Sequence, residues 1–92
     1  MFTGLVRSLS SVVNVTPRPG GARIAVDLGP MAEGAALGDS ISINGACLTV
    51  AAKNGTVCEF DAVSETLSRT TLGRLRPGDL VNVEPSLRPA AA

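Results

Sequence analysis

Six residues with hydroxyl, thiol or carboxylate side chains are predicted to share one surface between positions 40 and 61. They are Ser40, Ser42, Cys47, Thr49, Glu59 and Asp61. Hydroxyls donate and accept hydrogen bonds and carboxylates accept them, so the set is suited to holding a polar ligand. Because the chain has two cysteines and no histidine, we expect no metal site. A Ser/His/Asp arrangement and a phosphate-binding loop are also missing from the sequence.

Two Asn-Gly pairs predict the strands that position these side chains. Asn-Gly tolerates the positive φ angles of tight hairpin turns and is a strong hairpin signal. A two-residue turn at Asn44-Gly45 sets Ile43 opposite Ala46 and Ser40 opposite Thr49. Opposite residues share a face, so this hairpin separates an apolar face from a polar one.

The second Asn-Gly pair completes a three-stranded meander. A two-residue loop at Asn54-Gly55 would mix apolar and charged side chains on each face, whereas a three-residue loop over 53–55 keeps them apart. We therefore predict the three-residue loop, with Gly55 in the left-handed conformation. The pairs that follow are Val50 with Cys58, Leu48 with Phe60, Thr49 with Glu59, and Cys47 with Asp61.

The remaining segments supply three more strands and a short helix. A long first strand runs through 5–7 and 12–15, a turn occupies 17–21, and further strands cover 23–28 and 80–84. Residues 29–34 are predicted to form a loop with a helical turn, because Pro30 suits the first position of a helix. A short helix from about Glu65 to Thr70 would have Ser64 as its N-cap, Leu67 and Leu72 facing inward, and Gly73 at its end. The predicted fold is all-β: a six-stranded antiparallel Greek-key β-barrel with a short helical insertion before the last strand.

Composition limits the classes of partner. The 92 residues form one domain with a formal net charge of zero, which argues against nucleic acid, because phosphate binding needs clustered Lys and Arg. Apolar runs are shorter than the ~20 residues of a membrane span. The first residues lack a basic region followed by an apolar block, so we expect a cytoplasmic protein. Cys47 and Cys58 fall on opposite faces about 10 Å apart, too far for a disulfide.

Five motifs in order resemble riboflavin synthase, and the chain is similar to that enzyme's N-terminal lumazine-binding barrel. The motifs are residues 1–6 (MFTGLV), 44–50 (NGACLTV), 60–61 (FD), 65–73 (ETLSRTTLG), and 78–84 (GDLVNVE). The resemblance covers residues 1–84, and we take 1–86 as the lumazine-binding barrel and 87–92 as a tail.

The resemblance implies a ligand and a site. Riboflavin synthase converts two molecules of 6,7-dimethyl-8-ribityllumazine into riboflavin and a pyrimidinedione without metal or cofactor, between one barrel and another. We expect lumazine, riboflavin or FMN to bind here. The ligand-binding residues that the resemblance implies are Gly4, Leu5, Val6, Cys47, Leu48, Thr49, Asp61, Ala62, Val63, Ser64, Glu65 and Thr66. Residues near the reaction centre of an active enzyme would be Cys47, Ser40, Phe2 and Thr3.

Departures from the family pattern keep several functions open. The second barrel and the histidine-bearing segment after the sixth strand are absent, so the resemblance transfers binding better than catalysis. A flavin- or lumazine-binding module, completed by a second barrel in a homodimer, is the first hypothesis. An active synthase, as a homodimer or within a longer two-barrel chain, is the second. A non-catalytic interaction domain is the third.

Each candidate residue also has an ordinary structural role. Cys47 could be a small buried hydrophobe, and Ser40 and Thr49 could be plain strand residues. Glu65 suits the first turn of a helix, although one carboxylate among hydroxyls also suits a neutral polyol. Phe2 could be a core residue. The arginines at 69, 74 and 76 are expected to form a solvated face.

Overall fold

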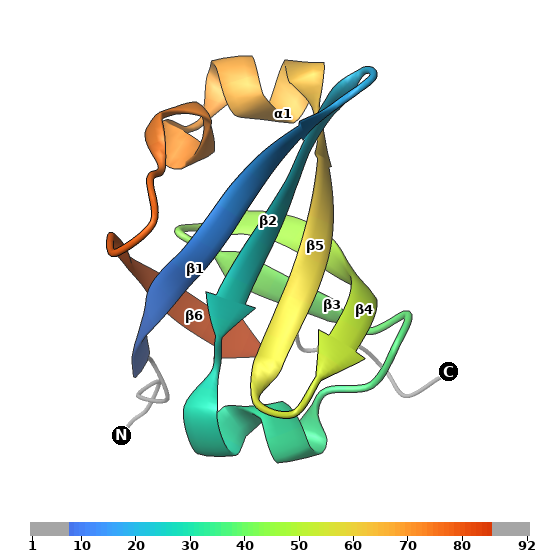
Figure 1. The fold of residues 1–92 in the computed structure, drawn as a ribbon, viewed down its shortest axis with the longest axis vertical. Helices are drawn as coiled ribbons and strands as arrows, with labels where there is room; N and C mark the ends of the chain where they lie inside the picture. The colour runs from blue at the N-terminus through green and yellow to red at the C-terminus, as the bar shows by residue number, and fades with distance from the viewer. Residues whose placement is uncertain (1–7, 86–92) are drawn as a thin grey trace.

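The computed structural model describes residues 8–85, which form a closed six-stranded antiparallel barrel (Figure 1). The strands are β1 (Ser8–Arg18), β2 (Gly21–Asp27), β3 (Ser40–Ile43), β4 (Ala46–Asn54), β5 (Val57–Val63) and β6 (Leu80–Pro85). Their order around the barrel is β1-β2-β5-β4-β3-β6. Strands β3, β4 and β5 follow one another as hairpins, and β2 lies beside β5, which makes a Greek key. The predicted fold class is confirmed.

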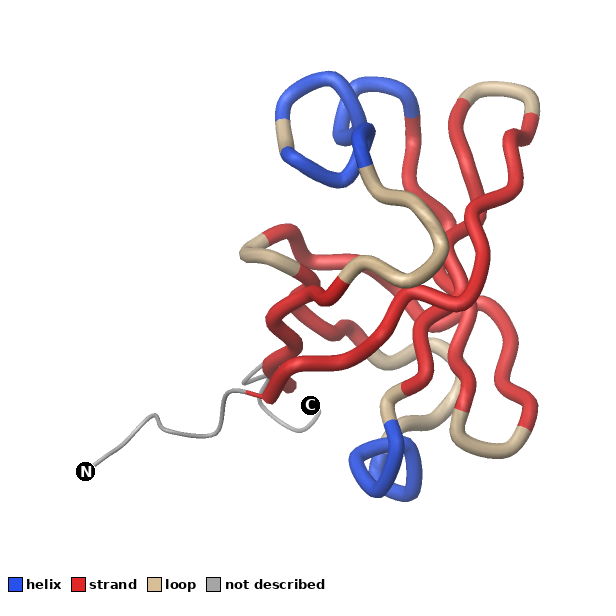
Figure 2. The backbone as a smooth tube through the Cα atoms, turned by 60° about the vertical axis from the view of Figure 1, so that its left-hand side comes forward, coloured by secondary structure: helices blue, strands red, loops and turns tan. Residues whose placement is uncertain are grey.

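Short helical segments cover the two ends of the barrel (Figure 2). The 3₁₀-helix η1 (Gly29–Gly34) lies at one end, with Pro30 in its first turn as predicted. The helix α1 (Ser64–Arg69) and the 3₁₀-helix η2 (Thr71–Arg74) lie at the other. Leu72 of η2 is buried and Leu67 packs against the core. None of the helices within residues 8–85 has the length and apolar character that crossing a membrane requires.

Two predictions about the helix ends are wrong. Ser64 is the first residue of α1, and its N-cap is Val63, which cannot cap through its side chain. The capping hydroxyl is instead Thr70, which accepts a hydrogen bond of 3.1 Å from the Leu72 amide at the start of η2. Gly73 lies inside η2, where a Cβ would come within 2.6 Å of the Leu67 carbonyl oxygen. The close approach of α1 and η2 therefore requires glycine at this position.

The first hairpin has the predicted register throughout. Ser40 lies opposite Thr49, and Ile43 opposite Ala46. Asn44 and Gly45 have φ angles of +51° and +88°. A two-residue hairpin turn that matches the twist of its strands needs positive φ angles at both of its central residues. Asn44 also joins the hairpin to β6, because its Oδ1 accepts a hydrogen bond of 2.8 Å from the Asn82 amide.

The second hairpin has a different register from the predicted one. The turn residues are Gly55 and Thr56, and Val50 pairs with Phe60. The register shifts between Val50 and Ala52, which places a β-bulge at Ala51. A bulge inserts one residue into one strand and so changes which residues face inward beyond it. The faces are therefore as predicted, with Val50 and Phe60 buried, while the predicted pairs are wrong by two residues on one strand.

The first strand is longer than predicted. It continues through Pro17, which pairs with Ala22, and the turn is formed by Pro19 and Gly20. Proline is tolerated there because β1 pairs with β6 only over 8–11, so among the described strands none lies along the second edge of β1 at Pro17. At Ser11 the strand pairs with both β2 and β6, so β1 closes the barrel.

Aliphatic side chains fill the barrel, as the aromatic content of 2% requires. Phe60 is the largest fully buried side chain, and the core cluster to which it belongs includes inward-facing residues of all six strands. The buried core residues on the strands include Val12, Ile24, Val26, Ile41, Ile43, Leu48, Val50, Cys58, Val81 and Val83. Because inward positions alternate with outward ones, burying these residues fixes which polar side chains face outward.

Candidate functional site

Four polar side chains cross four neighbouring strands on the outer face of the barrel. Arg23 of β2 lies opposite Asp61 of β5, Asp61 opposite Thr49 of β4, and Thr49 opposite Ser40 of β3. We call Arg23, Asp61, Thr49 and Ser40 the polar row. Directly opposite residues have Cβ atoms about 4.5 to 5.5 Å apart, within reach of one ligand chain.

A less polar strip runs beside the polar row. Val63 lies opposite Gly21, and Cys47 opposite Ser42. Val63 follows Asp61 by two residues on β5, and Cys47 precedes Thr49 by two residues on β4, so both face outward on the same side of the Thr49–Asp61 pair. Val63 is 59% exposed. Its partner Gly21 leaves it uncovered, and no larger residue fits there because a Cβ would collide with the Ala62 carbonyl. The strip therefore offers a low apolar surface next to hydrogen-bonding groups.

An ion-pair network holds the end of the polar row. Arg23 donates from Nε to Asp61 Oδ1 at 2.8 Å and from Nη2 to Asp61 Oδ2 at 3.0 Å. Its Nη1 also donates to Glu59 Oε1 at 3.4 Å. The hydrogen bonds from Arg23 lower the pKa of the Asp61 carboxyl, and those carboxylates in turn raise the pKa of Arg23. Asp61 is therefore ionised near neutral pH and accepts hydrogen bonds only.

An open hollow of about 330 Å³ lies where β4 meets α1. We call it the Cys47 hollow; its lining residues are Ala46, Cys47, Glu65, Thr66, Arg69 and Thr70. Glu65 Oε2 pairs with Arg69 Nη2 at 3.0 Å across one helical turn. The hollow brings together two separate predicted segments, the one around Cys47 and the one around Glu65. The resemblance assigned both segments to one ligand site, and in the fold residues of both segments line the same hollow.

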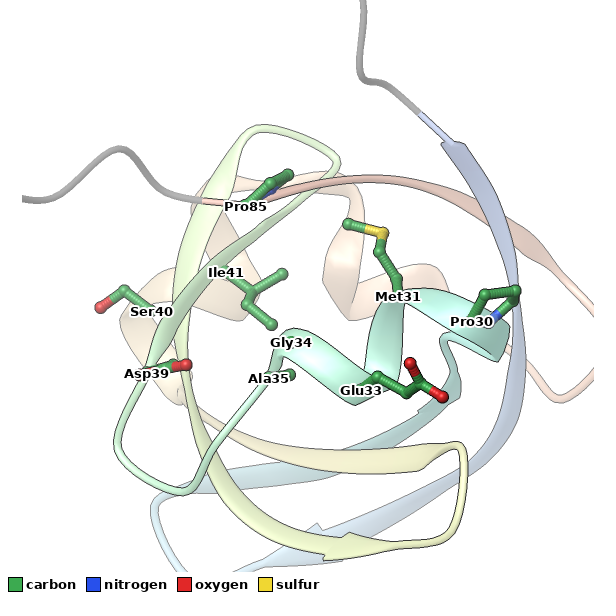
Figure 3. Close-up of a pocket in the computed structure, with 9 residues that line it drawn as sticks. All are labelled: Pro30, Met31, Glu33, Gly34, Ala35, Asp39, Ser40, Ile41 and Pro85. Atoms are coloured by element: carbon green, nitrogen blue, oxygen red, sulfur yellow. The ribbon is translucent and has the colours of Figure 1, made fainter.

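A second pocket, of about 490 Å³, lies between η1, β3 and the end of β6 (Figure 3). Met31, Ile41 and Pro85 contribute apolar surface to it, and Glu33 and Asp39 contribute carboxylates. Figure 3 shows the Ser40 side chain pointing away from Met31 and Ile41. Ser40 therefore borders this pocket while its hydroxyl belongs to the outer face that carries Thr49.

The predicted site residues fall into three groups. Cys47, Thr49, Asp61, Val63, Ser64 and Glu65 are exposed on the outer surface, and Ser40 and Thr66 are half-buried there. Leu48 and Ala62 are buried in the core, so only their backbone could meet a ligand on the outer face. Predictions for Phe2, Thr3, Gly4, Leu5 and Val6 lie outside the described residues.

Cys47 and Cys58 both lie within the described part of the chain and are thiols, not a disulfide. Cys47 is exposed, so the interpretation of it as a buried hydrophobe is wrong. Cys58 is buried, and burial raises the pKa of its thiol. Within residues 8–85, no three His, Cys, Asp or Glu side chains are placed so that together they could hold a metal ion.

Arg23 is the member of the site that the sequence analysis missed. The alternation over 23–28 placed Arg23 on the outer face of its strand, which was a usable signal. Its partner was not evident, because β2 and β5 are distant in sequence and become neighbours only through the Greek-key connection. The exposed arginines at 69, 74 and 76 are solvated as expected.

Comparison with known proteins identifies the family of the chain. Residues 3–86 match the lumazine binding domain family. The riboflavin synthase of Escherichia coli (strain K12) is 42% identical over 85 residues, which cover 91% of this chain and 40% of the enzyme. That of Mycobacterium tuberculosis is 42% identical over 87 residues, covering 91% of this chain and 42% of the enzyme. The chain thus spans about two fifths of the length of these relatives. With its closed barrel, the chain belongs to the lumazine-binding domain family and is related to riboflavin synthase.

Proposed function

We propose that this chain binds a ribityl-bearing lumazine or flavin on the outer face formed by the polar row and the Cys47 hollow. The ligand is 6,7-dimethyl-8-ribityllumazine, riboflavin or FMN, and binding requires no further cofactor. The observation that carries the proposal is the alignment of polar side chains on four adjacent strands beside the hollow that holds Glu65 and Thr66.

The chemistry of the face matches the two parts of such a ligand. A ribityl chain is a neutral polyol, which hydroxyls and carboxylates recognise by donating and accepting hydrogen bonds. Thr49, Ser40 and Asp61 supply these groups in one line. The ring system needs a flat, less polar surface, which Val63 and Cys47 supply next to that line.

A second copy of the chain is proposed to cover the ligand. Binding sites normally bury most of a ligand's surface, whereas this face lies on the outside of a barrel and its hollow is open. Two-fold pairing is the commonest way for one chain to supply the missing wall. We place the interface over the N-terminal strand and the ligand face, and the protein in the cytoplasm, where cysteines stay reduced.

The ligand is tested by titrating riboflavin and 6,7-dimethyl-8-ribityllumazine into the protein, with flavin fluorescence and calorimetry as readouts. We expect saturable binding of at least one of them at micromolar concentration. An absence of saturable binding up to high micromolar concentration rejects the proposal and leaves a non-catalytic interaction domain.

The position of the site is tested by Thr49→Val combined with Glu65→Gln. Removing one hydroxyl and one charge should weaken riboflavin binding about tenfold or more. The matched control is Thr56→Val combined with Glu33→Gln, since both residues are exposed, Thr56 in the turn between β4 and β5 and Glu33 in η1, away from the polar row and the Cys47 hollow. Equal affinity in both double variants would mean that the ligand binds elsewhere.

The dimer is tested by sedimentation at micromolar concentration with and without riboflavin. Ligand that binds between two copies should shift the equilibrium toward the dimer by mass action. A monomer under both conditions contradicts the proposed covering copy.

Synthase activity is the second candidate, because the relatives named above are riboflavin synthases at 42% identity. If the chain is active, Cys47 and Ser40 are the described residues nearest the reacting ring, with Phe2 and Thr3 completing the centre. Incubation with 6,7-dimethyl-8-ribityllumazine should then yield riboflavin. A protein that binds the lumazine and forms no riboflavin is a binding module only.

A further inference from the structure

Arg23 is built into the ligand face in a way that its ordinary role as a surface arginine does not explain. It lies between the buried residues Ala22 and Ile24 on β2 and projects outward. Three of its nitrogens donate hydrogen bonds, two to Asp61 and one to Glu59. A bidentate contact with a planar guanidinium fixes the orientation of a carboxylate as well as its charge.

The Asp61 carboxylate lies between Arg23 on one strand and Thr49 on the next. A carboxylate has about four acceptor positions on its two oxygens, and Arg23 occupies one on each oxygen. The other positions can accept hydrogen bonds from hydroxyl donors. A hydroxyl group of a ligand lying over Thr49 would therefore meet an ionised, oriented acceptor.

We propose that Arg23 is a positioning residue for the ligand: it holds Asp61 as the acceptor for a ribityl hydroxyl group beside Thr49. This inference rests on the proposed function and adds to it the part of the ligand that the polar row recognises. Arg23 itself does not touch the ligand in this arrangement. Its effect on binding passes through the orientation of Asp61, which distinguishes it from a direct contact.

If Asp61 accepts a hydrogen bond from a ribityl hydroxyl group, the protein should distinguish between flavins that differ only in their side chain. Riboflavin and lumiflavin share the isoalloxazine ring, and lumiflavin has a methyl group where riboflavin has the ribityl chain. The unaltered protein should bind riboflavin more tightly than lumiflavin. Arg23→Gln should weaken riboflavin binding about tenfold and leave lumiflavin binding unchanged. Arg23→Lys keeps the charge and loses the bidentate geometry, so it should also reduce the preference for riboflavin.

A double-variant cycle separates positioning from general support of the fold. Asp61→Asn should reduce the preference for riboflavin, and adding Arg23→Gln to Asp61→Asn should cause little further loss, because the two residues act as one unit. Arg74→Gln, an exposed arginine of η2, is the matched control and should leave both affinities unchanged. If Arg23→Gln does not fold, judged by circular dichroism, the Arg23→Lys variant decides in its place.

Three results would overturn the inference. Equal loss of riboflavin and lumiflavin binding would make Arg23 a support of the face as a whole. Unchanged riboflavin binding in Arg23→Gln, or equal affinity of the unaltered protein for the two flavins, would mean that no ribityl hydroxyl group binds to Asp61 beside Thr49. After equal loss of both flavins, or unchanged riboflavin binding in Arg23→Gln, the proposed function survives. Equal affinity of the unaltered protein for the two flavins leaves binding of the ring alone, and failure to bind either flavin removes both the inference and the proposed function.

Discussion

Arg23 and Asp61 face each other across β2 and β5 and are joined by two hydrogen bonds, of 2.8 and 3.0 Å. The pair links β2 to β5, the last of the three hairpin-connected strands that follow β2 in the chain. It is partly exposed, with Asp61 at 56%, so its effect on stability is screened by solvent. Its effect on the pKa of Asp61 nevertheless gives a measurable pH dependence.

We expect Asp61 to contribute to acid sensitivity. Its pKa is lower in the folded state than the ordinary value of 3.8, so the unfolded chain binds the proton more readily. The stabilising effect is present above that ordinary value and is lost as pH falls through the folded-state pKa. Urea unfolding of Asp61→Asn between about pH 5 and about pH 2 should show a smaller fall in stability than the unaltered protein. Glu33→Gln, at an exposed carboxylate of η1, is the control; an identical slope in Asp61→Asn would contradict the prediction.

Phe60 should be the most costly side chain to truncate. It is fully buried and is the largest such residue in the core, so Phe60→Ala leaves a cavity and should lower the free energy of unfolding by about 3 to 5 kcal/mol. Leu37 is 66% exposed, and Leu37→Ala should change stability by less than about 0.5 kcal/mol. Chemical denaturation of both variants gives the comparison, and a loss below about 1 kcal/mol for Phe60→Ala would mean that the core repacks freely.

Two glycines isolate the cost of a positive φ, because both have room for a Cβ and only one of them has a positive φ. Gly45 has a φ of +88°, and a Cβ at this position would meet only open space. Gly45→Ala should therefore cost about 1 to 2 kcal/mol through φ alone. Gly34 also has open space but lacks a positive φ, so Gly34→Ala should be neutral or slightly stabilising. Thermal unfolding of the two variants measures the difference, which disappears if the turn can change its type.

Lys53 is expected to stabilise η1 through its ammonium group. Its Nζ donates to the Ala32 carbonyl at 2.6 Å and to the Ala35 carbonyl at 2.8 Å. These carbonyls lie near the C-terminal end of the 3₁₀-helix, where a cation is favourable. Lys53→Met keeps the aliphatic stem and should lower the free energy of unfolding by about 1 kcal/mol. Arg74→Met is the control at an exposed site, and equal effects of the two changes would exclude a specific role for Lys53.

The sequence predicted those parts of the fold that depend on local patterns. Asn44 and Gly45 determine the first turn through their φ angles, and the register of that hairpin follows from it. Phe60 and Leu48 were placed in the core by alternation alone. The second register failed because the bulge at Ala51 has no local sequence signal: alanine fits both a bulge and a regular strand.

The candidate site could be predicted only strand by strand. Alternation placed Thr49 and Asp61 on the outer face, yet which of them lie opposite each other depends on the bulge. Arg23 joins them through a pairing of distant strands, β2 with β5, which sequence periodicity cannot specify. Long-range pairing therefore limits what a single sequence shows about this site.

The strand β6 closes the barrel by joining β1 to β3, and this has a consequence for the order of folding. Its pairs with β1, such as Ser8 with Val83, connect opposite ends of the described chain, whereas the β3–β4 and β4–β5 pairs are hairpins. Closing so long a loop costs entropy that local hairpins do not incur. We therefore expect β6 to dock last in folding and to exchange its backbone amide protons sooner than β4 does.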